Sequence, residues 1–233
     1  MRGIAVRINA EFDRTVVIRP PEREWIGSPA PGVERCMLDR IGGEVARATS
    51  LVRFAPGASF AAHDHDGGEE YLVVEGTFSD ETGDFPTGTY VRNPPGTRHA
   101  PRTEGGCTIF VKLRQFAEGD DRSVAIAIAD AAFGPGRGEG VEVALLHEHG
   151  AERVSAIRFA PGARAHAHDH PGGEEILVLE GTFQDENGAY PAGTWIRSPA
   201  GTGHAPFSDE GCLLYVKHGH LGEGLVGPEG DRP

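Results

Sequence analysis

The chain contains, at residues 57–76, the sequence GASFAAHDHDGGEEYLVVEG, and at residues 162–181 a close copy, GARAHAHDHPGGEEILVLEG. The copies are 105 residues apart, and the surrounding residues 53–112 align with 158–217 without a gap, at 37 identical positions of 60. A repeat of this length has the size of a domain, far above that of a solenoid unit. The sequence therefore predicts two copies of one domain.

Each copy contains two histidines at positions i and i+2, a glutamate four residues later, and a third histidine further along the chain. On a strand, side chains at i and i+2 point to the same face. Imidazole nitrogens with a carboxylate oxygen suit borderline divalent metals, and four protein ligands leave one or two coordination positions open. We expect one metal ion per copy, with iron or zinc favoured and manganese, nickel and copper as alternatives; a structural metal without chemistry is the competing interpretation. The predicted ligands are His63, His65, Glu69 and His99 in the first copy, and His168, His170, Glu174 and His204 in the second.

Adjacent glutamates leave one ligand choice open. Strict alternation places Glu69 and Glu70 on opposite faces of their strand, and neither face is plainly the inner one. The same ambiguity applies to Glu174 and Glu175 in the second copy.

Composition excludes several classes of function. The net charge of -13 would repel phosphate backbones and anionic membranes, so we expect neither as a partner. There is no apolar run near the ~20 residues of a membrane span, and the first residues do not resemble a signal peptide. Three cysteines without CxxC spacing favour a reducing, cytoplasmic location.

Short β-rich runs, separated by Gly, Pro, Asp and Asn, predict an all-β antiparallel sandwich or barrel with no helix of ten residues or more. We expect residues 1–31 to form an N-terminal arm on the first domain or a dimer contact, residues 32–118 the first domain, residues 119–222 the second, and residues 223–233 a flexible tail. Residues 123–130 are predicted to be a strand that opens the second domain.

These motifs resemble the cupin superfamily, a family of jelly-roll, or double-stranded β-helix, proteins. The first cupin motif, G-x5-H-x-H-x3,4-E-x6-G, matches from Gly57 to Gly76 and again from Gly162 to Gly181. The second motif, G-x5-P-x-G-x2-H-x3-N, matches at four positions in each copy, from Gly88 to His99 and from Gly193 to His204; Thr103 and Ser208 replace its final Asn. The six-residue gap before the last glycine of the first motif selects Glu69 and Glu174 as the ligands.

Within the superfamily, the sequence pattern GGEE-x-LV-x-EGTF-x-DE-x-G is similar to that of ChrR-type cupin domains, which occur in zinc-binding anti-sigma factors. It also resembles small diketone-cleaving dioxygenases that use iron. The resemblance implies a tandem (bicupin) metal-binding protein, and we favour an oxygenase acting on a small enolisable or dicarbonyl-like substrate. The alternative is a metal- or ligand-sensing, anti-sigma-like regulator without catalysis, although the His-x3-Cys-x2-Cys module of that design is absent from this chain.

The residues around the motifs differ between the copies. The first has Arg98, Arg102, Tyr71 and Tyr90, so we predict that it binds an anionic substrate; the alternative is that both arginines face solvent. The second is more apolar. His166, found only there, is interpreted as a rim residue, with a ligand role as the alternative. Four further histidines are interpreted as surface residues: His147, His149, His218 and His220.

Overall fold

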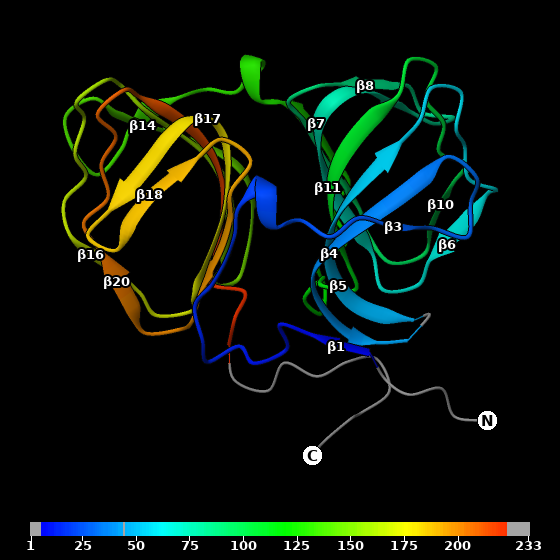
Figure 1. Cartoon of the computed structure of the whole chain (residues 1–233), viewed down its shortest axis with the longest axis horizontal. Helices are drawn as coiled ribbons and strands as arrows, with labels where there is room; N and C mark the ends of the chain where they lie inside the picture. The colour runs from blue at the N-terminus through cyan, green and yellow to red at the C-terminus, as the bar shows by residue number, and fades with distance from the viewer. Residues whose placement is uncertain (1–5, 44, 223–233) are drawn as a thin grey trace. The chain divides into compact units, whose positions relative to one another are not determined.

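A computed structural model describes residues 6–43 and 45–222 of the chain (Figure 1). Within them, the helical segments are two three-residue 3-10 turns, η1 (Pro20–Glu22) and η2 (Ile128–Asp130). The described residues divide into two compact units, 6–10 with 24–129 and 11–23 with 130–222. The predicted all-β fold is confirmed. The predicted tail, residues 223–233, lies outside the described residues.

The first unit contains a nine-stranded antiparallel sheet and a two-stranded ribbon. The main path runs β1-β4-β5-β11-β7-β9-β12, with β3 paired to β4 and β8 to β7, and β6 pairs with β10. The strands are β1 (Val6–Ile8), β3 (Ile26–Gly27), β4 (Val33–Gly42), β5 (Ala46–Phe54), β6 (His63–His65), β7 (Glu69–Ser79), β8 (Asp84–Pro86), β9 (Thr89–Asn93), β10 (Thr97–His99), β11 (Cys107–Leu113) and β12 (Val124–Ala127).

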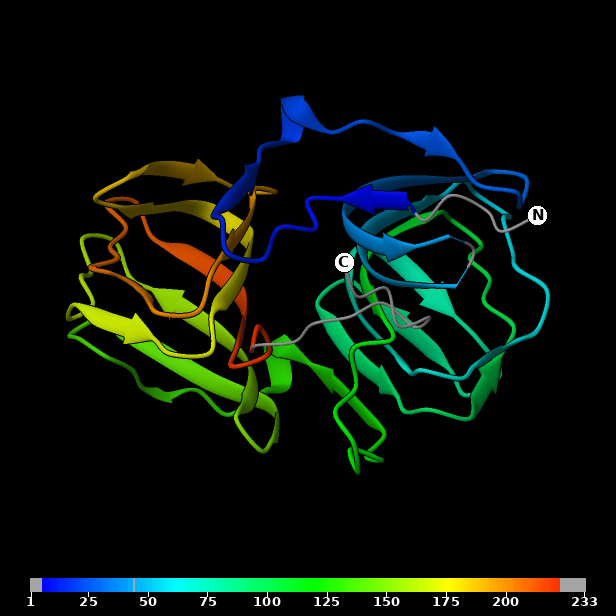
Figure 2. The ribbon, with the colours of Figure 1, turned by 90° about the horizontal axis from the view of Figure 1, so that it is seen from below.

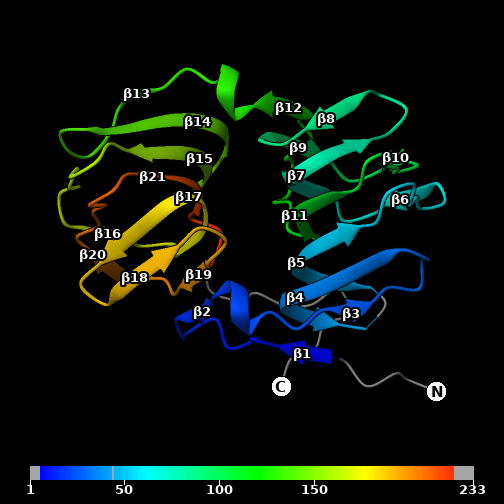
Figure 3. The same cartoon turned by 45° about the horizontal axis from the view of Figure 1, so that its top comes forward.

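The second unit repeats this topology with eight strands and a ribbon. Its main path is β13-β14-β15-β21-β17-β19-β2, with β18 paired to β17, and β16 pairs with β20. Figure 3 shows the same succession of strands across each unit. The strands are β2 (Val16–Ile18), β13 (Gly134–Pro135), β14 (Val141–His149), β15 (Glu152–Phe159), β16 (His168–His170), β17 (Glu174–Asp185), β18 (Gly188–Pro191), β19 (Trp195–Ser198), β20 (Thr202–His204) and β21 (Cys212–His218).

The last glycine of the first motif allows β7 and β17 to change partners along their length. Gly76 has φ +75°, and a Cβ there would lie 2.1 Å from the carbonyl oxygen of Gly106. Gly181 has φ +69°, and its Cβ would lie 2.0 Å from the oxygen of Gly211. Only glycine fits this close backbone approach. Before the glycine each strand pairs within the main sheet, and after it with β8 or β18.

Alternation along β7 separates an inner from an outer face. Tyr71 and Val73 belong to the hydrophobic core of the first unit, so Glu69, two residues earlier, also points inward. Glu70 therefore points outward, where Arg92 and the Tyr90 hydroxyl contact it. Strand β17 repeats this arrangement, with its inner side chains in the core of the second unit.

The two units exchange their first strands. The segment that contains β2 aligns with the segment that contains β12 at an offset of 108 residues, and each segment precedes one copy of the repeat. Strand β2, however, pairs with β19 of the second unit, whereas β12 pairs with β9 of the first. Figure 2 shows the dark-blue β2 beside the yellow-orange strands of the second unit. The sequence-based boundaries at 31 and 118 do not follow this exchange: residues 11–23 lie in the second unit, and residues 119–129 in the first.

A buried arginine holds each exchanged segment. Arg92 stacks on Phe116 at 4.1 Å and forms an ion pair with Asp120, just before β12. Arg197 stacks on Phe12 at 4.2 Å and donates to the carbonyl oxygen of Glu11, just before β2. Because both guanidinium groups are fully buried, these pairings fix where each exchanged segment lies.

None of the described helical segments has the length and apolarity needed to span a membrane.

The exchange predicts that a substitution in β2 destabilises the second unit. Val17 packs against the core of the second unit. Val17→Asp should therefore lower the free energy of unfolding of that unit by about 1–3 kcal/mol, because a carboxylate enters apolar surroundings. Ile128→Asp should instead destabilise the first unit, because it places a carboxylate at a buried position of that unit, where the backbone N–H of Ile128 donates to the oxygen of Gly88. Amide hydrogen exchange of β17 and β7 measures the two effects separately.

Ala125→Asp serves as the control, because Ala125 is exposed and occupies the position of Val17 in the aligned segment. It should change the free energy of unfolding of either unit by less than about 0.5 kcal/mol. If Val17→Asp speeds amide hydrogen exchange in β7 and leaves β17 unchanged, the assignment of β2 to the second unit is contradicted.

Candidate metal centres

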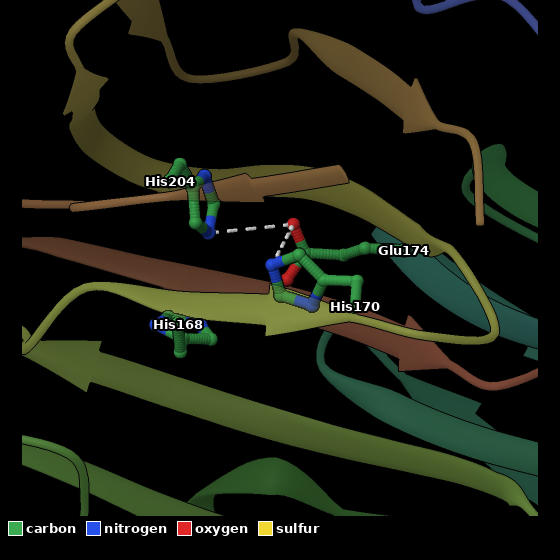
Figure 4. A group of neighbouring side chains, drawn as sticks. All are labelled: His168, His170, Glu174 and His204. Atoms are coloured by element: carbon green, nitrogen blue, oxygen red, sulfur yellow. Dashed lines mark ion pairs between the residues drawn. The ribbon is translucent and has the colours of Figure 1, made fainter. Parts of the chain in front are cut away.

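Four side chains from three strands converge inside the second unit (Figure 4). His168 and His170 come from β16, Glu174 from the start of β17, and His204 from β20. Their donor atoms all lie within 4.8 Å of one another. Glu174 Oε2 is 3.5 Å from His170 Nε2 and 3.6 Å from His204 Nε2. The structure thus brings together all four residues that the sequence selects for this copy.

The first unit holds the matching group. His63, His65 and His99 meet the same 4.8 Å limit. Glu69 Oε2 lies 3.5 Å from His65 Nε2 and 3.4 Å from His99 Nε2, but Glu69 does not belong to the tight set. Register explains the meeting of the histidines, since β6 pairs with β10 and places His63 directly opposite His99.

The outer glutamates have other partners. Glu70 accepts hydrogen bonds from the Tyr90 hydroxyl at 3.0 Å and from Arg92. Glu175 contacts Trp195 Nε1 at 2.8 Å and His220 Nε2 at 2.9 Å. The geometry therefore places Glu69 and Glu174 beside the histidines, as the motif spacing indicates.

Unpaired buried nitrogens show that both groups suit a cation. Nε2 of His65, His99 and His170 is buried and has no hydrogen-bond partner among the described residues. Leaving such atoms unpaired is costly, and a metal ion bound by their lone pairs would remove that cost. The residues present therefore fit a divalent metal.

Neighbouring oxygens orient the rings. Nδ1 of His63 and of His168 lies 2.9 Å from a carbonyl oxygen two residues earlier, which directs Nε2 toward the centre. His99 Nδ1 lies 3.1 Å from Asp80 Oδ2, and His204 Nδ1 lies 3.5 Å from Asp185 Oδ2. Carboxylate–histidine pairs of this kind set the tautomer and orientation of metal ligands.

Burial keeps most of the imidazoles neutral. Burial, followed by the nearby His99 and His63, lowers the pKa of His65 to about 3. Burial likewise lowers the pKa of His170 to about 4. For His204 burial acts in the same direction, but its contact with Asp185 prevails and raises the pKa. Neutral imidazole is the form that binds metals.

The two glutamates differ electrostatically. Burial raises the pKa of Glu69 to about 7, although Asn93 donates a hydrogen bond to it. Burial also acts on Glu174, but the hydrogen bond from His218 and the neighbouring imidazoles lower its pKa. A carboxylate so deeply buried as Glu69 would be stabilised as an anion by a cation beside it.

A cavity of about 480 Å³ reaches the second centre. All four of its predicted ligands line the cavity, together with apolar side chains that include Val143, Ile176 and Leu214. Larger residues occupy two equivalent positions in the first unit, where Phe60 corresponds to Ala165 and Tyr71 to Ile176. Phe60 packs against Phe54 and His63, with ring centroids 5.5 Å and 6.0 Å apart. The Phe60 ring therefore occupies space beside His63, and the anionic substrate of the first site stays a prediction.

The four residues predicted to bind substrate are held in other contacts or buried. Arg98 is exposed and pairs with Asp64 at 2.8 Å, and Arg102 donates to the carbonyl oxygen of Asp80. Tyr90 is fully buried on the outer face. Tyr71 is buried in the inner core, and its hydroxyl has no partner among the described residues.

Three of the histidines interpreted as surface residues are not exposed. His147 is buried, the side chain of His220 is 3% exposed, and His218 is half-buried against Glu174. The only signal in the sequence was that His218 directly follows the repeated Val-Lys pair, where the first copy has Leu113. His166 is exposed, in agreement with a rim position, and its carbonyl oxygen orients His168.

Glu69→Gln should weaken metal binding at the first centre by about 10- to 100-fold, because the amide removes the anionic donor. Glu70→Gln is the matched control and should leave metal affinity unchanged, since Glu70 contacts Arg92 on the other face. Competition with a chromogenic chelator, in protein whose second centre is removed by His168→Ala and His204→Ala, measures both. A larger loss for Glu70→Gln would show that the strand register is off by one.

The second unit of chelator-treated protein should be the more acid-sensitive. Between pH 6.5 and 4 an unfolded chain protonates His170 and the folded unit does not, so lowering the pH favours unfolding, by about 2 kcal/mol. The lowered pKa of His168 acts in the same direction as that of His170, and the raised pKa of His204 offsets part of the effect. In the first unit, the lowered pKa values of His65 and His99 act in this direction too, but Glu69 takes up a proton in the folded state between pH 7 and 4.5 and opposes them.

Labelling of buried thiols can measure this difference. Cys107 and Cys212 are equivalent buried cysteines, one in each unit, and burial raises the pKa of both thiols to about 11. Dithiodipyridine, which reacts with thiols in acid, should modify Cys212 faster than Cys107 at pH 4.5. Equal rates, or faster labelling of Cys107, would contradict the directions of the pKa shifts that are given above for the histidines and glutamates of the two centres.

Comparison with solved structures identifies the same architecture. A candidate dioxygenase from Nostoc punctiforme matches with a TM-score of 0.75 at 14% identity, over 92% of this chain and 86% of the other. Protein Ylba from Escherichia coli matches with a TM-score of 0.69 at 16% identity, over 89% and 92%. A variant of oxalate decarboxylase from Bacillus subtilis matches with a TM-score of 0.61 at 15% identity, over 87% and 76%. At these identities the likeness shows a shared fold.

A search of curated protein sequences found no significant match. The model of the ChrR cupin-like domain matches twice, at residues 13–117 and 121–222. Each match begins with the strand that is exchanged and ends after the predicted ligands of that copy. The chain therefore belongs to the ChrR cupin-like domain family, in two tandem copies.

Proposed function

We propose that this bicupin binds one divalent metal per unit and is a metal-dependent oxygenase of the non-haem iron type. The second centre would be the reactive one, and the substrate a small enolisable or dicarbonyl-like molecule. The cavity carries the proposal, because it gives a small molecule access to all four predicted ligands of that centre. A metal with a purely structural role would need no such access.

The cavity has the volume and lining of a small-molecule site. Its size falls within the 300–1,000 Å³ or so usual for ligand pockets. Its walls are mainly apolar, and Arg137, Ser155 and His218 are among its polar residues. Apolar walls around a few polar groups would exclude water and orient a small polar molecule.

The chain supplies a suitable set of donors. Two or more neutral imidazoles and one carboxylate, as in this centre, leave positions open to substrate. A bound metal would act as a Lewis acid on a substrate oxygen, and iron would add the redox chemistry that zinc lacks. Arg137 lies at the exposed side of the cavity and would attract the negative charge of an enolate.

Two of the structural neighbours named above are enzymes, or candidate enzymes, by their names, which is an analogy at the level of the fold. Membership of the ChrR cupin-like family favours a second candidate, a metal- or ligand-sensing regulator without catalysis. Stoichiometric recovery of a sigma factor on the purified chain would favour that candidate.

Metal analysis followed by oxygen uptake tests the proposal. Protein purified without added metal should contain about two metal ions per chain, one for each donor set. The iron-loaded chain should consume oxygen with acetylacetone, a β-dicarbonyl compound. His204→Ala should abolish uptake, whereas His99→Ala should retain most of it, because the cavity opens onto the second centre. Equal losses in both variants would contradict the assignment of the reaction to that unit, and metal-loaded protein without uptake would contradict the oxygenase.

A further inference from the structure

His218 distinguishes the second centre from the first. It ends β21, at the position that Leu113 occupies on β11. Its Nε2 lies 2.9 Å from Glu174 Oε1, and its ring stacks on His170 with centroids 5.3 Å apart and planes 10° apart. It also lines the cavity. The ring is therefore fixed between a predicted ligand and the space that a substrate would occupy.

The two carboxylates are held through different oxygens. Glu174 directs Oε2 to His170 and His204, while Oε1 accepts the hydrogen bond from His218. In the first unit, Glu69 Oε2 faces the histidines and also accepts a hydrogen bond from Asn93 Nδ2 at 3.2 Å.

The other oxygen of Glu69 has no such neighbour. Among the described residues, none donates a hydrogen bond to Glu69 Oε1. Leu113 offers no donor, and Ser198 replaces Asn93 in the second unit. The chain thus contains two versions of one centre that differ in which oxygen of the carboxylate is occupied.

We propose that His218 is a positioning residue that limits Glu174 to one metal-binding oxygen, and so leaves a coordination position for a substrate that chelates through two oxygens. A carboxylate binds a metal through one or both oxygens, and a bidentate carboxylate occupies two positions. The hydrogen bond to Oε1 competes for the lone pairs that bidentate binding needs. Glu69 is free to use both oxygens, which closes the first centre to a chelating substrate. The proposal rests on the metal binding proposed above.

This role does not depend on the protonation state of His218. Facing a carboxylate oxygen, Nε2 carries the proton in the neutral tautomer and in the imidazolium alike. The contact with Glu174 is therefore a donated hydrogen bond in either state.

Manganese in a chain with a single intact centre gives a readout that is independent of turnover. The first centre is removed by His63→Ala with His99→Ala, and the full chain is loaded with Mn²⁺ without oxygen. Water proton relaxation then counts the exchangeable waters on the metal, and titration with acetylacetone measures the affinity for a two-oxygen chelator. In the parent, acetylacetone should displace about two waters.

His218→Leu copies the first unit and should lower the water count by about one and the acetylacetone affinity about tenfold. His218→Gln keeps an N–H donor and should restore both values. The reverse transplant, Leu113→His with Asn93→Ser in protein lacking the second centre, should raise the water count of the first centre.

Unchanged water number and acetylacetone affinity in His218→Leu, with Mn²⁺ still bound, would overturn the role of His218. Failure of His218→Gln to restore them would overturn it as well, because loss of ring packing would then be the cause. If instead these values change as expected and the iron-loaded chain consumes no oxygen, the oxygenase fails and the positioning role stands. A parent chain that binds no Mn²⁺ overturns both.

Discussion

The alternation of side chains at the start of β7 and β17 is the constraint on which the rest of the structure depends. Adjacent glutamates must point to opposite faces of the strand. The inner pair, Glu69 and Glu174, meets the histidines, and the outer pair, Glu70 and Glu175, meets buried polar groups on the other face. A slip of one residue would exchange the two glutamates between the faces, and would also move the apolar core side chains of the strand to the other face.

The outer face links the centre to the exchanged strands. Glu70 contacts Arg92, and Arg92 holds the segment before β12 through Phe116 and Asp120. Arg197, at the equivalent position, holds the segment before β2. Since removal of one member of a buried ion pair is costly, the outer glutamate and arginine constrain each other. The strand that supplies the inner carboxylate is thus supported by contacts on its opposite side.

Small differences between the copies give the two centres different surroundings. A change from Phe60 to Ala165 and from Tyr71 to Ile176 removes ring atoms near the second centre, where the cavity lies. A change from Leu113 to His218 adds a donor beside the carboxylate. Identical ligands can therefore carry different chemistry, because access and the contacts of the ligands decide how a metal is used.

Much of this protein could be predicted from its sequence. The repeat, the turn residues and the spacing of His63, His65, Glu69 and His99 predict two all-β cupin domains and their donor sets, because local period and motif spacing determine strand faces. The exchange of β2 and β12 could not be predicted, since the apolar pattern of a short strand does not say which unit it joins, and the choice depends on contacts such as Arg197 with Phe12. The contact of His218 with Glu174, 44 residues away in the chain, and the cavity beside them arise from tertiary packing alone, because both depend on which side chains fill the interior and not on the order of residues along one strand.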